Sequence, residues 1–390
     1  MGAVVGATFP VQEGHLRLPS QSTEHDERRN SSALRYPVLD GIRGVAAIAV
    51  VLFHVGNWVH LDLLFPRGYL AVDFFLCLSG FVVCGAYGER AAAGMSFGAF
   101  MRIRLIRLYP LIALGILLGF LVYFGREIAL GTNLLSPGEW LSVTGLNLLL
   151  LPYLHVTPLG ESAFPLNVVA WSLFAEILVN VVWFVWLRRT APLVQAVVML
   201  LSGAAIVILM MRGFTIDDQV SDVDVFGIGL FRAFFSFFLG ALIHRFRATL
   251  VPRTPALSAW TILLVFTVLM AVPVNDNLRI YEATFLFLAS PALMILSLKA
   301  RCTSATLMLC RAGERISYPI YALHRPLFLA LLYGFNLLGI EAYRWTYVAL
   351  GLVLALCVAT LAERLYDRPI RSALAALSRQ RPPVALTGTA

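Results

Sequence analysis

Stretches of apolar residues, each about 20 residues long, recur along this chain and limit its fold more than any other feature. A helix of that length crosses the roughly 30 Å hydrocarbon core of a bilayer, where every backbone polar group must be bonded internally. Eleven such stretches are centred near residues 50, 78, 116, 149, 176, 202, 236, 265, 289, 328 and 354. They predict an all-α protein, a polytopic membrane helical bundle.

The composition excludes three other classes of protein. Of the 390 residues, 59% are hydrophobic and 13% are charged, whereas soluble domains are about 25% charged. A disordered chain would be more polar, a nucleic-acid-binding protein would be richer in charge, and a disulfide-stapled secreted domain would carry denser cysteine. We therefore expect a lipid bilayer as partner and no nucleic acid.

The positions of the basic residues orient the segments across the membrane. If every stretch except 141–157 spans and the amino terminus is cytoplasmic, 22 Lys and Arg face the cytoplasm and five face outward. Such a bias satisfies the positive-inside rule. Counting 141–157 as a span would instead place Arg188 and Arg189 outside. We therefore predict about ten transmembrane helices in the cytoplasmic (inner) membrane, with both termini in the cytoplasm.

The stretch at 141–157 is short and is bracketed by Gly145, Pro152 and Pro158. Irregular backbone survives at membrane depth only where protein or a water-filled cavity surrounds it. This pattern predicts a re-entrant or outer-face segment.

The two ends of the chain are polar. Residues 1–35 contain no apolar core of a signal peptide and are expected to form a disordered cytoplasmic tail. A membrane domain is predicted over 36–372, followed by a second cytoplasmic tail at 373–390.

The first predicted span carries Arg43 and His54, which are eleven positions apart. In a helix they are about 16 Å apart along the axis and close to the same face. A neutral imidazole at that depth can accept a proton from a hydroxyl, so His54 is a candidate general base. The alternative is a structural histidine bonded to a neighbouring carbonyl.

Acidic residues interrupt two further spans. Asp73 lies just inside the second span, where Ser79 and Gly80 would let another helix or a ligand approach closely. Glu176 follows Trp171 in an otherwise apolar helix and needs a cationic or donor partner. Ordinary helix packing is the alternative for Asp73, and a structural ion pair with Arg232 is the alternative for Glu176.

Arg104 and Arg107 stand three positions apart at the inner end of the third span. They project together from a helix and can hold an anion with several oxygens. Anchoring to lipid headgroups of the inner leaflet is the alternative.

The ninth predicted span begins at Ile316 and contains Tyr318, His324 and two prolines. We expect the prolines to break helical bonding, so that this element borders a polar cavity. A purely structural, hydrogen-bonded role is the alternative for His324.

Together these segments resemble the acyltransferase 3 family of integral-membrane O-acyltransferases over roughly residues 35–372. Each motif alone is weak, but their order along the chain is specific to that family. The motifs are LDGIRGVAAIAVVLFH at 39–54, FFLCLSGF at 74–81, RLIRLYP at 104–110, WSLFAE at 171–176, SYPIYALHRP at 317–326 and the closing Tyr366-Asp367-Arg368-Pro369. The chain departs from the pattern at Asp367, where the family often has Glu, and after Glu176, where the usual aromatic residues are absent.

The resemblance implies an enzyme that transfers an acyl group, often acetyl, from cytoplasmic acyl-CoA (acetyl-CoA) to a hydroxyl. The acceptor would be a sugar, a polysaccharide or a glycosylated small molecule. A macrolide-type antibiotic is an alternative acceptor, and a membrane transporter or flippase is the alternative of another class. The acyl chain length and the oligomeric state stay open, and no metal is expected.

Each candidate residue has an expected role in this reaction. We expect His54 to act as the general base, with Asp73 or Glu176 as the acid that orients it. The arginines Arg43, Arg104 and Arg107 are expected to hold the phosphates of CoA. The residues expected to contact the substrates are Ser79, Trp171, Tyr318 and His324.

Overall fold

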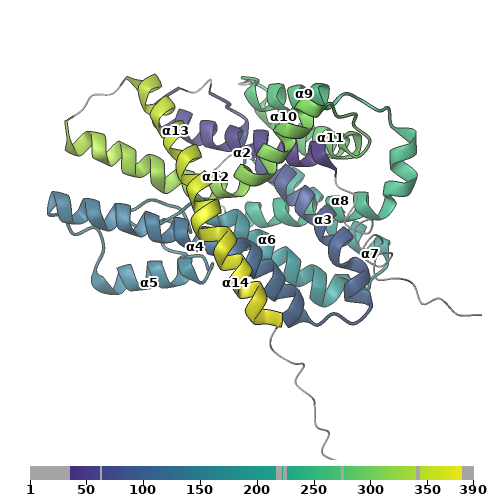
Figure 1. Cartoon of the computed structure of the whole chain (residues 1–390), viewed down its shortest axis with the longest axis horizontal. Helices are drawn as coiled ribbons and strands as arrows, with labels where there is room; N and C mark the ends of the chain where they lie inside the picture. Colours follow the sequence, from purple (N-terminus) through teal and green to yellow (C-terminus); the bar gives the residue numbers. More distant parts are fainter. Residues whose placement is uncertain are drawn as a thin grey trace, which may run out of the picture. The chain divides into compact units, whose positions relative to one another are not determined.

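A computed structural model describes residues 36–61, 64–216, 222, 226–273, 276–339 and 343–379, which belong to one compact unit that begins at Tyr36 (Figure 1). Helices form the regular structure in these ranges, and the β-bridges there are isolated ones. The all-α prediction is therefore confirmed. The predicted tail at 1–35 and residues 380–390 of the predicted carboxyl-terminal tail lie outside the described residues.

The helices follow one another along the chain with short connections. They are α2 (Pro37–Trp58), η1 (Gly68–Leu70), α3 (Ala71–Ala92), α4 (Phe97–Leu130), α5 (Pro137–Leu148), α6 (Ala170–Val182), η2 (Trp183–Leu187), α7 (Pro192–Met211), α8 (Phe226–Leu250), η5 (Val251–Arg253), α9 (Ala259–Ala271), α10 (Leu278–Thr284), η6 (Phe285–Ala289), α11 (Ser290–Ser297), α12 (Ser304–Leu337), α13 (Arg344–Ala362), η7 (Glu363–Asp367) and α14 (Arg368–Arg379). Because α14 continues to Arg379, the predicted domain boundary at 372 falls inside a helix.

Eight helical segments in the described part of the chain are long and apolar enough to cross a membrane. They are Pro37–Trp58, Gly68–Ala92, Phe97–Leu130, Ala170–Leu187, Pro192–Met211, Phe226–Arg253, Leu278–Ser297 and Arg344–Leu377. The protein is therefore a multi-pass membrane protein. The other two predicted spans fall on α9, which has 13 residues, and on α12, whose 34 residues include several charged side chains. The count of about ten stays a prediction.

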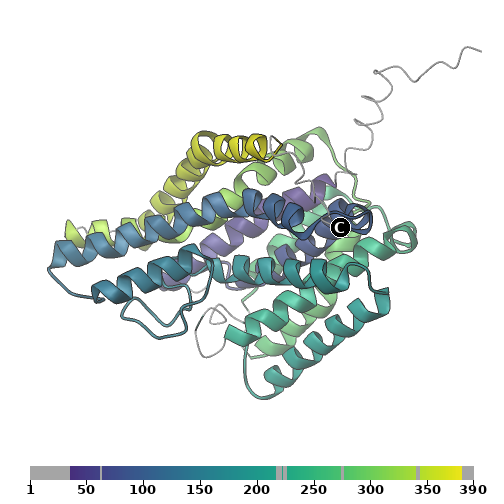
Figure 2. The same cartoon turned by 90° about the horizontal axis from the view of Figure 1, so that it is seen from below.

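The stretch at 141–157, which was predicted not to span, includes the second half of the short helix α5, and α5 lies beside α4 (Figures 1 and 2). Ser136 and Glu139 form a capping box that begins the helix. Near this end, Trp140 Nε1 donates to Glu127 Oε2 at 3.0 Å. At the other end, Tyr109 Oη donates to the Leu148 carbonyl at 2.9 Å. Its 12 residues place α5 outside the eight spanning candidates.

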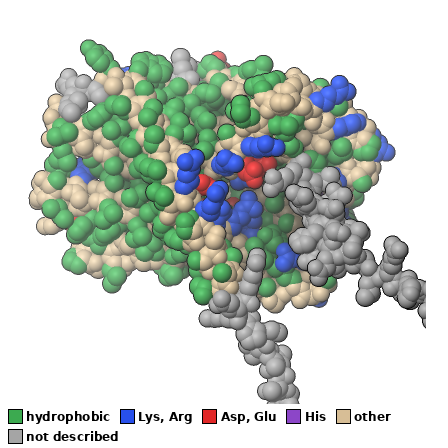
Figure 3. All heavy atoms as spheres, viewed as in Figure 1, with side chains coloured by type: hydrophobic (Ala, Val, Ile, Leu, Met, Phe, Trp, Pro, Cys, Tyr) green, Lys and Arg blue, Asp and Glu red, His purple; other side chains and the backbone are tan. Residues whose placement is uncertain are grey.

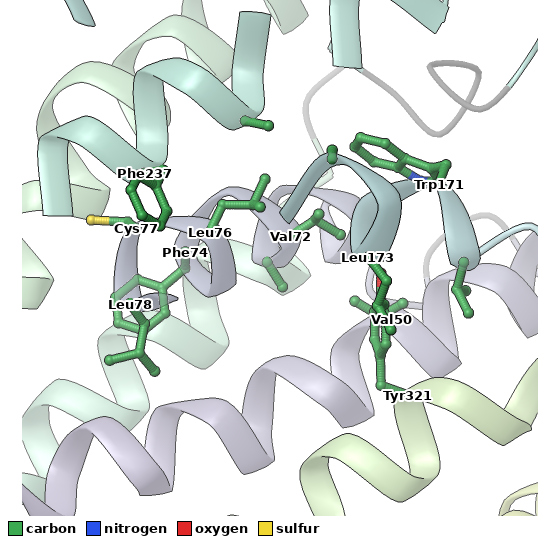
Figure 4. Packing of buried hydrophobic residues seen from close by; sticks show 14 of the residues in the cluster. Val50, Val72, Phe74, Leu76, Cys77, Leu78, Trp171, Leu173, Phe237 and Tyr321 are labelled. Atoms are coloured by element: carbon green, nitrogen blue, oxygen red, sulfur yellow. The ribbon is translucent and has the colours of Figure 1, made fainter. Parts of the chain in front are cut away.

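The centre of the bundle depends on close crossings between helices. A Cβ on Gly80 of α3 would lie 1.9 Å from the Phe237 carbonyl oxygen, and one on Gly240 of α8 would lie 1.8 Å from that of Cys77. Glycine at both positions lets the two backbones touch. Figure 4 shows Phe237 packed against Cys77 at this crossing.

The long helix α12 corrects the expectation for the ninth span. It begins at Ser304, twelve residues before Ile316, and continues through Pro319 and Pro326 to Leu337. Pro326 has no N–H to bond to the Ala322 carbonyl. Asn167 Nδ2 donates to that carbonyl instead, at 2.9 Å. The helix continues through both prolines, and at Pro326 an external amide replaces the missing backbone donor.

Candidate active site

Two histidines far apart in the sequence meet inside the bundle. His54 comes from α2 and His324 from α12, and their ring centroids are 5.4 Å apart with an interplanar angle of 28°. The exposed fraction is 8% for His54 and 0% for His324. The sequence singled out each residue separately, but only the packing of α2 against α12 brings them together.

The two imidazoles have different surroundings. His54 makes no hydrogen bond with the described part of the chain, and its ring nitrogens are not among the unbonded atoms that are sealed from solvent. They therefore face accessible space. In contrast, His324 Nδ1 lies 3.0 Å from the Ile320 carbonyl oxygen and 2.9 Å from that of Tyr321. The carbonyl-bonded arrangement that we considered for His54 is found at His324.

Glu176 is bound to Arg104 and not to Arg232. The Arg104 guanidinium donates to Glu176 Oε1 in a charge-assisted hydrogen bond. Ser79 Oγ donates to the same carboxylate oxygen at 2.6 Å, and Arg104 Nη2 lies 3.3 Å from Ser79 Oγ. Three of the predicted site residues, from α3, α4 and α6, thus form one cluster. The alternative prediction, a structural ion pair between Glu176 and Arg232, is wrong.

Arg232 instead forms a bidentate ion pair with Asp73. Its Nε and Nη2 atoms donate to Asp73 Oδ1 and Oδ2 at 3.1 and 2.7 Å, and both side chains are buried. The guanidinium also lies 5.8 Å from the ring centroid of Trp171. In the described residues, the hydrogen bonds and ion pairs of Asp73 and Glu176 go to groups other than His54.

The predicted arginines lie near the amino-terminal end of α4. Arg107 acts electrostatically on both Arg43 and Arg104. Arg43 has Asp40 at 3.6 Å on its own helix, and Arg104 has Glu176. Within the described ranges, Arg107 makes no hydrogen bond or ion pair. Asp40, Glu176 and Glu314 all act on Arg43, whereas Arg107 has no carboxylate bonded to it in the described part of the chain. Arg107 is therefore the cation of this group that is best placed to hold an anionic ligand.

Tyr318 connects this cationic group to α12. Its hydroxyl donates to the Leu108 carbonyl, one residue beyond Arg107. The charges of Glu176, Arg107 and Asp367 all act on the Tyr318 hydroxyl. Asp367 also bonds to Arg371, with 3.1 Å between Oδ2 and Nε. The closing motif of the chain therefore lies near the site residues contributed by α4 and α6.

The face of the molecule drawn in Figure 3 is mostly hydrophobic, with Lys and Arg side chains gathered around a few acidic ones where the surface is hollowed. A cavity of about 550 Å³ opens at the start of α12. Its lining residues are Ser304, Leu307, Met308, Arg311, Ala312 and Arg315.

In the residues that the structure describes, no group of three His, Cys, Asp or Glu side chains gathers to hold a metal ion.

Sequence reasoning missed several buried polar residues that connect separate segments of the chain. Tyr321 shares a 2.6 Å hydrogen bond with Ser172, which also donates to the Val169 carbonyl. Glu282 accepts from the Tyr69 hydroxyl at 2.6 Å and from the Ile216 N–H at 2.9 Å. An acid inside an apolar stretch was the available signal for Glu282.

Comparisons with known proteins agree with the resemblance seen in the motifs. A family model described as an acyltransferase domain matches residues 36–364. "Protein 2 in picA locus" of Rhizobium radiobacter is 36% identical over 184 residues, which cover 45% of this chain and 93% of that protein. No solved structure gives a significant match.

Proposed function

Because this chain belongs to the acyltransferase 3 family, we propose that it transfers an acyl group, preferably acetyl, from acyl-CoA to a hydroxyl of a carbohydrate acceptor. The acceptor is a sugar, a polysaccharide or a glycosylated small molecule such as a macrolide. The observation that carries the proposal is the placement of His54, a buried imidazole with accessible, unbonded nitrogens, on the same helix as Arg43.

The proposed donor site is the cationic group of Arg43, Arg104 and Arg107. CoA carries phosphates, and guanidinium groups bind phosphate through paired, charge-assisted hydrogen bonds. Arg107 is best suited to this role because it has no bonded partner in the described part of the chain. With the nucleotide held at this end, the pantetheine arm can extend along α2 toward His54.

In the proposed reaction, His54 takes the proton of the acceptor hydroxyl as its oxygen attacks the thioester carbonyl carbon. A C–O bond forms and the C–S bond breaks. The proton then passes from His54 to the departing CoA thiolate, so that ester and free thiol are the products. The reaction needs no oxidant, reductant or metal ion.

The carboxylates act on arginines in this proposal. Glu176 fixes Arg104 and Ser79, so it positions a phosphate-binding guanidinium. Asp73 neutralises Arg232 beside Trp171 and keeps the wall of the site in place. Both are therefore positioning residues, and an orienting contact from either acid to His54 would require a movement of its side chain.

We further propose ten membrane-spanning helices, with α9 and α12 added to the eight candidates. In this topology both termini are cytoplasmic, the protein lies in the inner membrane, and α5 with the chain that follows it is re-entrant or lies at the outer face. The charged residues Arg311, Glu314 and Arg315 are exposed and lie within the first twelve residues of α12, so in this topology the mostly apolar remainder of the helix, residues 316–337, spans the membrane.

The test uses purified protein in nanodiscs with acetyl-CoA and, separately, an envelope glycan fraction and a glycosylated macrolide. We expect release of CoA thiol that depends on the acceptor, with a matching ester found by mass spectrometry. Acceptor movement across sealed vesicles without thiol release would instead support a transporter. Full ester formation by a correctly inserted His54→Ala variant would refute the proposed mechanism.

A further inference from the structure

One nitrogen of the imidazole pair lacks a partner. Both near neighbours of His324 Nδ1 are carbonyl oxygens, which only accept, so Nδ1 carries the hydrogen. The lone pair of the neutral ring is therefore on Nε2. This atom is sealed from solvent and has no hydrogen-bond partner. Buried acceptors without a donor are rare in native proteins, and each one calls for an explanation.

Neither His54 nor water supplies the missing donor. The two ring centroids are 5.4 Å apart, and no hydrogen bond joins the rings. Because Nε2 has almost no accessible surface, solvent does not reach it in this structure. A donor must therefore come from a ligand that displaces the side chains around Nε2 when it binds beside His54.

The reacting hydroxyl of an acceptor does not satisfy both imidazoles. It has a single proton, which the general base must accept during transfer. If His54 takes that proton, His324 needs a second donor from the same ligand. The two ring centroids are only 5.4 Å apart, so the second donor must lie close to the reacting hydroxyl. A hydroxyl on the adjacent carbon meets this requirement.

We infer that the acceptor presents a vicinal diol, in which one hydroxyl reacts at His54 and its neighbour donates a hydrogen bond to His324 Nε2. This inference rests on the proposed function and specifies the chemistry of the acceptor. A monohydroxyl ligand would bury the Nε2 lone pair without a donor, and sites built to bond a substrate hydroxyl reject analogues that lack it.

The surroundings of His324 keep its ring in one orientation. Two carbonyls hold Nδ1, and Pro326 lies two residues further along α12. The Ala322 carbonyl, left without its helical donor by Pro326, is bound by Asn167. His324 is thus a preorganised acceptor that binds substrate.

The experiment compares three small acceptors with saturating acetyl-CoA. The probes are trans-cyclohexane-1,2-diol, cyclohexanol and trans-2-methoxycyclohexanol, which keeps one hydroxyl but replaces the second donor by an ether. Ester is measured by mass spectrometry and CoA thiol by absorbance. The diol has two hydroxyls that can react, which gives it a twofold statistical advantage. Beyond this factor, we expect kcat/KM for the diol to exceed that for either monoalcohol about 5- to 150-fold, because a monoalcohol leaves a buried acceptor unpaired.

Two variants then assign the discrimination to His324. The ratio should fall to about two in His324→Leu and be partly retained in His324→Gln, whose amide oxygen lies near the position of Nε2. KM for acetyl-CoA should not change with the variant. A wild-type kcat/KM ratio of diol to monoalcohol no greater than about two, or an unchanged ratio in His324→Leu, would overturn the inference. Esterification of none of the three alcohols would count against the proposed function as well.

Discussion

Asp73 and Arg232 face each other across α3 and α8 in a bidentate ion pair sealed inside the bundle. The two residues are 159 positions apart, and their helices touch at the Gly80 and Gly240 crossing. A charge pair at this depth is expensive to form and still more expensive to break, because removing one partner leaves the other charge buried alone.

Asp73→Ala should therefore destabilise the protein by about 3–5 kcal/mol. Thermal unfolding in detergent, followed by fluorescence size exclusion, measures the loss. The double variant Asp73→Leu with Arg232→Met is the matched comparison, because it removes both charges and should recover most of the stability. A single variant as stable as the wild type would show that the pair contributes nothing.

His54→Ala should lower acyl transfer by about 10²–10⁴-fold, the usual contribution of a general base. Initial rates of ester formation at saturating acetyl-CoA measure the effect. His155→Ala provides the control, because His155 is exposed and its ring stacks only with that of Tyr153 among the described residues. A loss of similar size in both variants would argue against a special role for His54.

Arg107→Ala should raise KM for acetyl-CoA about 10- to 150-fold, the value of one hydrogen bond to a charged group. KM for the acceptor should stay constant, since Arg107 lies at the proposed donor site. Arg102 is exposed on the same helix, so Arg102→Ala tests for a general electrostatic effect. Steady-state kinetics that show equal shifts in both variants would remove Arg107 from the donor site.

Glu176 and Arg104 should show coupled effects. Each single alanine variant already loses the bond between Glu176 and Arg104. The loss of stability in the double variant should therefore be smaller than the sum of the losses in the two single variants, with a coupling free energy of about 0.5–3 kcal/mol. The cycle is measured by thermal unfolding, and KM for acetyl-CoA gives a second readout. Strict additivity would mean that the two side chains act independently.

Gly240→Ala should cost about 1–3 kcal/mol of stability, because its Cβ would lie 1.8 Å from a backbone oxygen that has little room to move. Gly227 lies on the same helix, and a Cβ added there would meet no atom within 4 Å. Gly227→Ala is therefore the matched control and should be neutral or slightly stabilising. Equal melting temperatures for the two variants would contradict the close crossing of α3 and α8.

Local pattern was sufficient for much of this protein. The apolar stretches of about 20 residues predicted helices, because a spanning segment must satisfy the hydrogen bonds of its own backbone. Ionisable residues within those segments marked His54, Asp73 and Glu176, since such groups are costly in an apolar helix. The ordered motifs pointed to the family. Each of these properties depends on residues that are neighbours on one helix.

The pairings between helices were decided only by the tertiary structure. Sequence reasoning offered Arg232 as a partner for Glu176, whereas the fold gives Asp73 to Arg232 and Arg104 to Glu176. The fold also brings the ring centroids of His54 and His324 to 5.4 Å from each other. Helical periodicity predicts which face of its helix a side chain occupies. The residue that this side chain contacts depends on where two helices cross, and the crossing point is set by the packing of the whole bundle.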